Sequence, residues 1–135
     1  MNKAILTGRL TKDPDMRYLP EGTAVTKFTL AVDKEMSNQK KQEAQDAGLP
    51  TADFINVTCW GQTAEFAGNY LYKGQKIGVE GRIESRSWKA DDGSARYATE
   101  IRAQNIEPQE WKKDKEAEQQ DMTGFHKTAE KAPWE

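Results

Sequence analysis

Apolar and polar side chains alternate along five stretches of this 135-residue chain, and no other feature limits its fold as much. Successive side chains of a β-strand point to opposite faces of the sheet, so alternation with a period of two predicts a strand with one buried face. In residues 24–33, for example, Phe28 and Leu30 share one side, whereas Lys27 and Thr29 share the other. The predicted strands are residues 3–10, 24–33, 53–60, 75–88 and 96–106.

A single helix is predicted between the third and fourth strands. In residues 63–72 apolar side chains recur at spacings of three and four, which places them in one stripe along a helix. Thr63 can cap the first turn, and Gly74 follows where a left-handed residue often ends a helix. Five strands with a helix at this position are typical of the oligonucleotide/oligosaccharide-binding (OB-fold) barrel. We therefore predict an all-β, five-stranded OB-fold barrel with one short α-helix.

Two segments lack a regular pattern. Residues 34–52 are rich in Lys, Gln, Asn and Glu without a consistent period, so we expect a long mobile loop there. The alternation stops at Glu107, and the few apolar side chains that follow are too scattered to offset the entropy of ordering the chain. The predicted organisation is thus a folded domain over residues 1–106 and a flexible, disordered C-terminal tail over residues 107–135.

Net charge does not by itself identify a partner. The whole chain carries a net charge of −2, and its acidic excess falls in residues 107–135. A nucleic-acid binder that relied on bulk charge would be clearly basic, so the cations of this chain would have to gather on one surface. The chain has no run of about 18 apolar residues and no apolar secretory signal, which predicts a cytoplasmic protein without membrane contact.

Three large aromatic side chains fall on the polar side of their strands. In residues 53–60 the apolar side is already filled by Ile55 and Val57, so Phe54 and Trp60 project to the other side. Trp88 shows the same inversion in residues 75–88. Bases present flat π-faces, and stacking one on an aromatic ring contributes about 1–3 kcal/mol whatever the identity of the base.

Several cations share the polar side with these rings and are candidate phosphate contacts. Aromatic rings interleaved with Arg and Lys are typical of a protein that binds single-stranded nucleic acid with little sequence preference. An alternative stays open for each ring, namely that a loop, the helix or a partner subunit covers it. The candidate phosphate-binding residues are Lys3, Arg9, Arg82, Arg86 and Arg102, with Lys34 and Lys73 near strand ends.

Seven short motifs resemble the bacterial-type single-stranded DNA-binding protein family. They run in order along residues 1–106: NKAILTGRL (2–10), DPDMRY (13–18), VTKFTLAV (25–32), WGQTAE (60–65), YLYKG (70–74), VEGR (79–82) and RYATE (96–100). The resemblance implies a homotetramer of barrels around which single-stranded DNA wraps during replication, recombination and repair. It also implies that Phe54, Trp60 and Trp88 are base-stacking positions. A fourth stacking position of the family corresponds to Met36, which stacks less well than an aromatic ring.

The C-terminus departs from the family pattern. Family tails usually end in an acidic run followed by Pro-Phe, which recruits replication and repair proteins. Here Pro133 and Trp134 keep the proline–aromatic pair, but the acidic run is missing. One hypothesis is that this altered end still binds partner proteins, as would suit a phage or mobile-element protein. The other is that the end is unstructured and its tryptophan has no role.

No group of residues predicts catalysis. The only histidine, His126, lies in the predicted tail without partners for acid–base or zinc chemistry. The only cysteine, Cys59, falls on an apolar strand face and is predicted to be a core residue. We therefore expect a non-catalytic protein without metal or cofactor. Two alternatives are a protein-interaction module of replication initiation built on the same barrel, and a nuclease.

Overall fold

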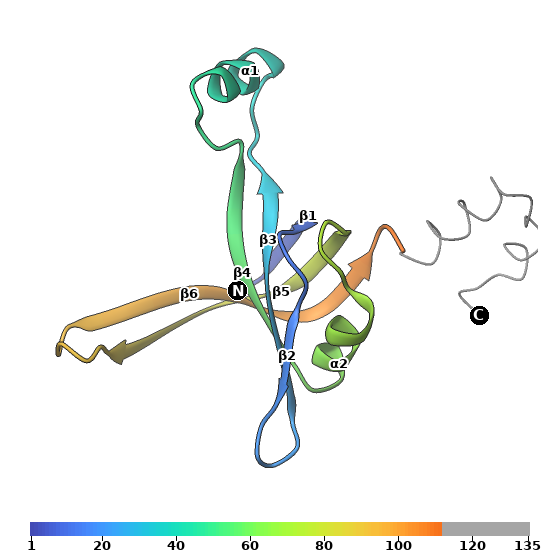
Figure 1. The fold of residues 1–135 in the computed structure, drawn as a ribbon, viewed down its shortest axis with the longest axis vertical. Helices are drawn as coiled ribbons and strands as arrows, with labels where there is room; N and C mark the ends of the chain where they lie inside the picture. The colour runs from blue at the N-terminus through green and yellow to red at the C-terminus, as the bar shows by residue number, and fades with distance from the viewer. Residues whose placement is uncertain (112–135) are drawn as a thin grey trace, which may run out of the picture.

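The computed structural model describes residues 1–111. Six strands and two helices make up these residues, and Figure 1 shows them in a central barrel with projecting strand pairs. The elements in chain order are β1 (Ala4–Leu10), β2 (Asp15–Tyr18), β3 (Ala24–Asp33), α1 (Asn38–Asp46), β4 (Ala52–Trp60), α2 (Gly61–Tyr70), β5 (Lys76–Lys89) and β6 (Ala95–Pro108).

The strands form one closed sheet. Their order is β1-β5-β6-β4-β3-β2, and β1 also pairs with β3, which closes the barrel. At the closure Arg9 lies opposite Ala31 and Leu10 lies opposite Leu30. The helix α2 follows β4 and packs against β2, β3, β4 and β6. The predicted all-β barrel with a helix before β5 is confirmed.

The barrel interior is filled by the side chains that the alternation assigns to the buried faces. Leu30, Val57, Ile77 and Val79 are fully buried there, and two alanines of α2 pack onto them. Burying a side chain of this size contributes roughly 1.5–3 kcal/mol, so this cluster is the main source of the barrel's stability.

Two glycines allow strands to approach each other where the barrel curves. A Cβ added to Gly8 would lie 2.3 Å from the carbonyl oxygen of Ala31, and one added to Gly81 would lie 2.2 Å from that of Arg102. The β5–β6 register shifts between Glu80 and Gly81, as expected for a β-bulge at a glycine within a strand.

The structure adds two elements that the alternation did not predict. Residues 15–18 form the short strand β2, which pairs with β3 and contacts α2 through the half-buried side chain of Met16 against Gly68. Residues 34–52 were expected to be an irregular loop, and this is wrong for residues 38–46, which form α1. Ser37 caps α1, since its side chain accepts a hydrogen bond from the Lys40 N–H, and Gly48 follows the helix with φ +75°.

The boundaries of α2 also differ from the prediction. The helix begins at Gly61 and not at Thr63, and Trp60 occupies the N-cap position without a capping side-chain hydrogen bond. Gly74 has φ +86° but lies three residues beyond the C-cap residue Leu71, in the turn that leads to β5. The glycine therefore serves the turn and not the helix end.

The chain that follows β6 is attached to the barrel. Sequence alone assigned residues 107–111 to the tail, yet β6 continues to Pro108 and the Gln109 N–H donates to the Lys76 carbonyl. Gln75, a fully buried side chain, donates to the carbonyl of Glu110. Trp111 packs edge-on against Phe66 of α2 with 6.3 Å between ring centroids. Residues 112–135, including the predicted partner-binding Pro133 and Trp134, lie outside the described residues.

The β3–β4 pair and the β5–β6 pair both project from the barrel (Figure 1). β3 and β4 extend together to α1, which makes no extensive contact with another described element. The hairpin of β5 and β6 over residues 82–102, here called the β5–β6 arm, extends in another direction. Alternation in residues 75–88 and 96–106 places Ile83 and Tyr97 on the apolar side of their strands and so predicts their burial, but both are exposed. The alternation predicts the side on which each lies, but no core reaches the arm to cover it.

Candidate nucleic-acid interface

The outer face of β3 and β4 carries a strip of polar side chains in register. Lys27 lies opposite Thr58, and Thr29 lies opposite Asn56. The Thr29 hydroxyl lies 3.0 Å from Oδ1 of Asn56, to which it donates a hydrogen bond. Residues directly opposite in a ladder project to the same side of the sheet, so these four side chains form one continuous surface.

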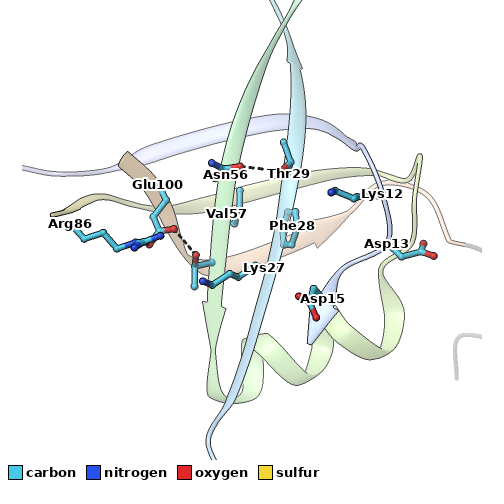
Figure 2. Close-up of a pocket in the computed structure, with 11 residues that line it drawn as sticks. Lys12, Asp13, Asp15, Lys27, Phe28, Thr29, Asn56, Val57, Arg86 and Glu100 are labelled. Carbon is cyan, nitrogen blue, oxygen red and sulfur yellow. Dashed lines mark hydrogen bonds and ion pairs between the residues drawn. The ribbon is translucent and has the colours of Figure 1, made fainter. Parts of the chain in front are cut away.

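This strip is the floor of an open groove of about 300 Å³. Figure 2 shows Lys27, Thr29 and Asn56 along the floor, with Arg86 and Glu100 on one flank and Lys12 and Asp13 on the other. Two core residues, Phe28 and Val57, also line the groove. The full lining is Lys12, Asp13, Asp15, Lys27, Phe28, Thr29, Asn56, Val57, Thr58, Arg86 and Glu100.

The three aromatic rings predicted to stack on bases all reach solvent. Phe54 is 63% exposed, Trp60 is 38% exposed and Trp88 is 44% exposed. Each ring lies two residues along its strand from a side chain that lines the groove: Asn56, Thr58 and Arg86 respectively. Two strand residues span about 7 Å, so each ring lies next to the groove lining. The rings therefore stand at the ends of the groove and not in the core.

A guanidinium lies over each of the two indoles. The Cζ of Arg86 is 4.7 Å from the ring centroid of Trp88, and the Cζ of Arg102 is 5.1 Å from that of Trp60. Both distances are within the range of a cation–π interaction, which is favourable by about 0.5–1 kcal/mol at exposed sites. The interface thus holds ring and cation together, as a base with its phosphate requires.

Most of the predicted phosphate-binding side chains already have a carboxylate partner. Among the described residues, Lys73 alone of the seven makes no ion pair, although its backbone N–H donates to Asp13. Surface pairs of this kind are weak, so phosphate can compete for the cation. The pairs are Lys3–Glu80, Arg9–Glu110, Lys34–Asp53, Arg82–Glu84, Arg86–Glu100 and Arg102–Glu84.

Of the seven predicted cations, Arg86 alone is among the residues that line the groove, and two of the others lie at a different strand. Lys3 and Arg9 lie before and on β1, which contributes no side chain to the lining. Arg9 is bidentate to Glu110, with two N–O distances of 3.1 Å, and also donates to the Gly74 carbonyl. This geometry holds the chain after β6 against the barrel. Arg9 is therefore engaged in fastening residues 109–111.

Met36 and Lys34 lie together at the base of the α1 extension. Met36 is half-buried between the end of β3 and the start of α1, and Lys34 pairs with Asp53 across the same strand pair. Phe54 follows Asp53 along β4. This end of the interface therefore contains one cation, Lys34, and two side chains that can lie against a base, Met36 and Phe54. The structure brings these three predicted residues into one region.

Sequence analysis missed two cations of the groove, Lys12 and Lys27. Neither forms an ion pair with any residue in the described part of the chain, and both side chains are exposed. Lys27 carries a signal that could have found it, because the alternation of residues 24–33 places it on the polar side. Lys27 lies opposite Thr58, and hence beside Trp60, because of the register in which β3 and β4 pair. The sequence of either strand alone does not predict this register.

Cys59 has the role that its strand face predicts. Its side chain is fully buried next to the core, and burial raises the pKa of the thiol to about 12. A thiol that stays protonated is a poor nucleophile and a poor metal ligand. Within residues 1–111 no three His, Cys, Asp or Glu side chains gather as a metal site, and neither described helix could span a bilayer.

Comparison with known proteins gives consistent matches. Residues 1–109 match the model of the "Single-strand binding protein family". A relative from Clostridium acetobutylicum, called single-stranded DNA-binding protein 2, is 48% identical over 123 residues, which are 90% of this chain and 86% of that protein. A single-stranded DNA-binding protein from Clostridium tetani is 44% identical over 93% of this chain and 81% of its own length. Another from Bacillus cereus is 47% identical over 79% of this chain and 59% of its own length.

Proposed function

Since the chain belongs to the single-strand binding protein family, we propose that it binds single-stranded DNA and coats exposed strands during replication, recombination and repair. The proposed role is binding without catalysis. The observation that carries it is the placement of three exposed rings, Phe54, Trp60 and Trp88, around one polar groove. A duplex hides the faces of its bases, so this surface is selective for unpaired strands.

The proposed path of the strand runs along the groove. Bases stack on Phe54, Trp60 and Trp88, with Met36 as a weaker fourth position. Phosphates meet Lys12 and Lys27, the groove cations without an ion pair in residues 1–111, and exchange with the carboxylates that hold the arginines. The proposed phosphate contacts also include Lys34, Lys73, Arg82, Arg86 and Arg102.

Titration with oligo-dT tests this function through intrinsic tryptophan fluorescence. Stacking of bases on Trp60 and Trp88 quenches their emission, and the affinity falls linearly on a log–log plot as salt rises, because phosphate contacts release counterions. Double-stranded DNA of the same length is the control and leaves the emission unchanged. If oligo-dT at low salt also leaves it unchanged, the function is wrong and the aromatic surface serves a protein partner instead.

We also propose that the protein assembles as a homotetramer. The exposed apolar side chains Ile5, Ile83 and Tyr97 support this, because none of them lines the groove and all would be covered by contact between barrels. Native mass spectrometry of the free protein tests the assembly. A single peak at the mass of one chain would contradict it.

For the end of the chain we propose a role in recruiting replication and repair proteins through Pro133 and Trp134. We also propose that the protein acts in the cytoplasm, at replication sites. Deleting residues 130–135 is expected to abolish binding to such partners while the affinity for oligo-dT stays the same. Unchanged partner binding would show that the tail end has no such role.

A further inference from the structure

Two carboxylates lie within the interface that is proposed to bind a polyanion. Glu84 on β5 and Glu100 on β6 are directly opposite each other in the β5–β6 arm, on the same side as Trp88. Arg82 and Arg102 are likewise opposite each other one repeat away. Like charges directly opposite in a ladder are destabilising, but here the carboxylates pair with arginines beside them, Glu84 with Arg82 and Arg102 and Glu100 with Arg86.

Each carboxylate contacts a guanidinium that lies over an indole. Oε1 of Glu100 is 3.6 Å from Nε of Arg86, and that guanidinium covers the ring of Trp88. Oε2 of Glu84 is 3.7 Å from a terminal nitrogen of Arg102, and that guanidinium covers the ring of Trp60. The same three-part arrangement of carboxylate, arginine and tryptophan thus occurs twice in one interface.

The two carboxylates are themselves held in place. Oε2 of Glu100 accepts a hydrogen bond of 3.0 Å from the hydroxyl of Thr58, and the Glu100 side chain is largely buried. Glu84 accepts a hydrogen bond of 3.0 Å from Nε of Arg82 on the same strand. A fixed carboxylate restricts the rotamers of a long arginine side chain, which then loses less rotamer entropy on binding.

We propose that Glu84 and Glu100 are positioning residues for single-stranded DNA, holding Arg102 over Trp60 and Arg86 over Trp88. One face of each indole is then covered by a guanidinium, and a base stacks on the part of the ring that remains exposed. The edge of the guanidinium still carries N–H donors that meet the neighbouring phosphate, because arginine can stack and donate at once. This proposal rests on the proposed function and assigns these two acidic residues to it.

The test compares two variants that each remove one negative charge from the groove. Glu100→Gln keeps a group that can accept from Thr58 but loses the charge that holds Arg86. Asp15→Asn is the control, since Asp15 lines the same groove and pairs with Arg17, which covers no indole among residues 1–111. Loss of charge alone tightens oligo-dT binding in both variants equally. Under the proposal, Glu100→Gln binds oligo-dT at least roughly threefold more weakly than Asp15→Asn, as expected when a cation–π contact is lost.

The difference must also depend on the arginine. In an Arg86→Ala background, Glu100→Gln and Asp15→Asn are expected to bind oligo-dT equally. A difference that persists without Arg86, or Glu100→Gln that binds as tightly as Asp15→Asn when Arg86 is present, overturns the proposal.

A spectroscopic measurement on the free protein tests the contacts without DNA. With 5-fluorotryptophan incorporated and resonances assigned by Trp→Phe variants, Glu100→Gln is expected to shift the ¹⁹F resonance of Trp88, and Glu84→Gln that of Trp60. Shifts of both resonances in both variants, or of neither, contradict the assignment. The two variants are independent, so either suffices if the other fails to fold. Wild-type protein that does not bind oligo-dT would instead overturn the proposed function, while the ¹⁹F shifts still report on the contacts.

Discussion

At the scale of single residues, the cations of the candidate interface are of two kinds: some already pair with a carboxylate and others do not. The arginines of the interface contact carboxylates of the same chain, whereas Lys27 has no such partner among residues 1–111. A phosphate that reaches an arginine must replace a carboxylate, but one that reaches Lys27 replaces only water and counterions. Lys27 therefore contributes its full charge to binding.

Replacing Lys27 with Gln is expected to weaken oligo-dT binding for all base sequences alike. One lost phosphate contact on a single strand lowers the steepness of the salt dependence by about 0.7 in log–log slope. Titrations at several salt concentrations measure it. Lys76→Gln is the matched control, because Lys76 is exposed on β5 but lies outside the groove lining. Equal slopes for the two variants would show that Lys27 does not contact the strand.

The thiol of Cys59 gives stability a dependence on pH. Burial raises its pKa from the ordinary 9.0 to about 12, so between these values the unfolded chain has lost a proton that the folded chain keeps. The free energy of unfolding therefore falls as pH rises through that window and is unaffected by this group below pH 9. Urea unfolding of wild type and Cys59→Ala at several pH values measures the difference, which is expected to stay constant below pH 9. A difference that stays constant above pH 9 as well would contradict the burial of the thiol.

At the scale of elements, close backbone approach decides where the barrel closes. β1 reaches β3 because Gly8 has no side chain, and a Cβ there would collide with the carbonyl oxygen of Ala31. Backbone atoms cannot move aside as the end of a flexible side chain can. The pairing of the first and third strands therefore depends on one missing methyl group.

Gly8→Ala is expected to lower the free energy of unfolding by roughly 1–3 kcal/mol, as overpacking in a well-packed region does. Gly78→Ala is the control, because Gly78 lies opposite Thr7 on the neighbouring strand and a Cβ there meets no atom closer than 3.7 Å. Chemical denaturation measures both variants. Similar destabilisation by both would show that β-propensity, and not the closure, is responsible.

The helix α1 is marked in the sequence by residues at its two ends and not by apolar periodicity. Its segment has no apolar stripe, in keeping with a helix that makes no extensive contact with another described element, so amphipathic periodicity does not reveal it. The terminal signals were present in the sequence, with Ser37 as N-cap and Gly48 beyond the end. Capping, and not burial, is what identifies a helix of this kind.

At the scale of the whole molecule, tryptophans divide between two tasks. Trp88 extends from the β5–β6 arm under Arg86, whereas Trp111 packs on Phe66 of α2 and fastens the chain after β6. Both are about two-fifths exposed, so exposure alone does not separate them. The two rings are distinguished by what they contact, which is Arg86 of the arm for Trp88 and Phe66 of α2 for Trp111.

Trp88→Ala and Trp111→Ala are expected to affect different properties, DNA affinity in the first and fold stability in the second. Trp88→Ala weakens oligo-dT binding by about 1–3 kcal/mol, the value of one stacked base, and leaves the unfolding transition unchanged. Trp111→Ala lowers the stability of the fold by about 1 kcal/mol through the lost aromatic contact and leaves DNA affinity unchanged. Oligo-dT titration and thermal unfolding of the same samples measure both. Loss of DNA affinity in Trp111→Ala would extend the interface to the α2 side.

Side-chain alternation is a local property of an extended chain, so it predicts five of the six strands, the side that each turns toward the core and the outward direction of Phe54, Trp60 and Trp88. Which side chains meet follows instead from how the strands pair and pack in the fold. The register that places Lys27 beside Thr58, the closure at Gly8 and the contacts of Glu84 and Glu100 with arginines over indoles depend on strands that are distant in the chain. The exposure of Ile83 and Tyr97 was decided in the same way, since a strand pattern shows which side faces inward but not how far the core extends.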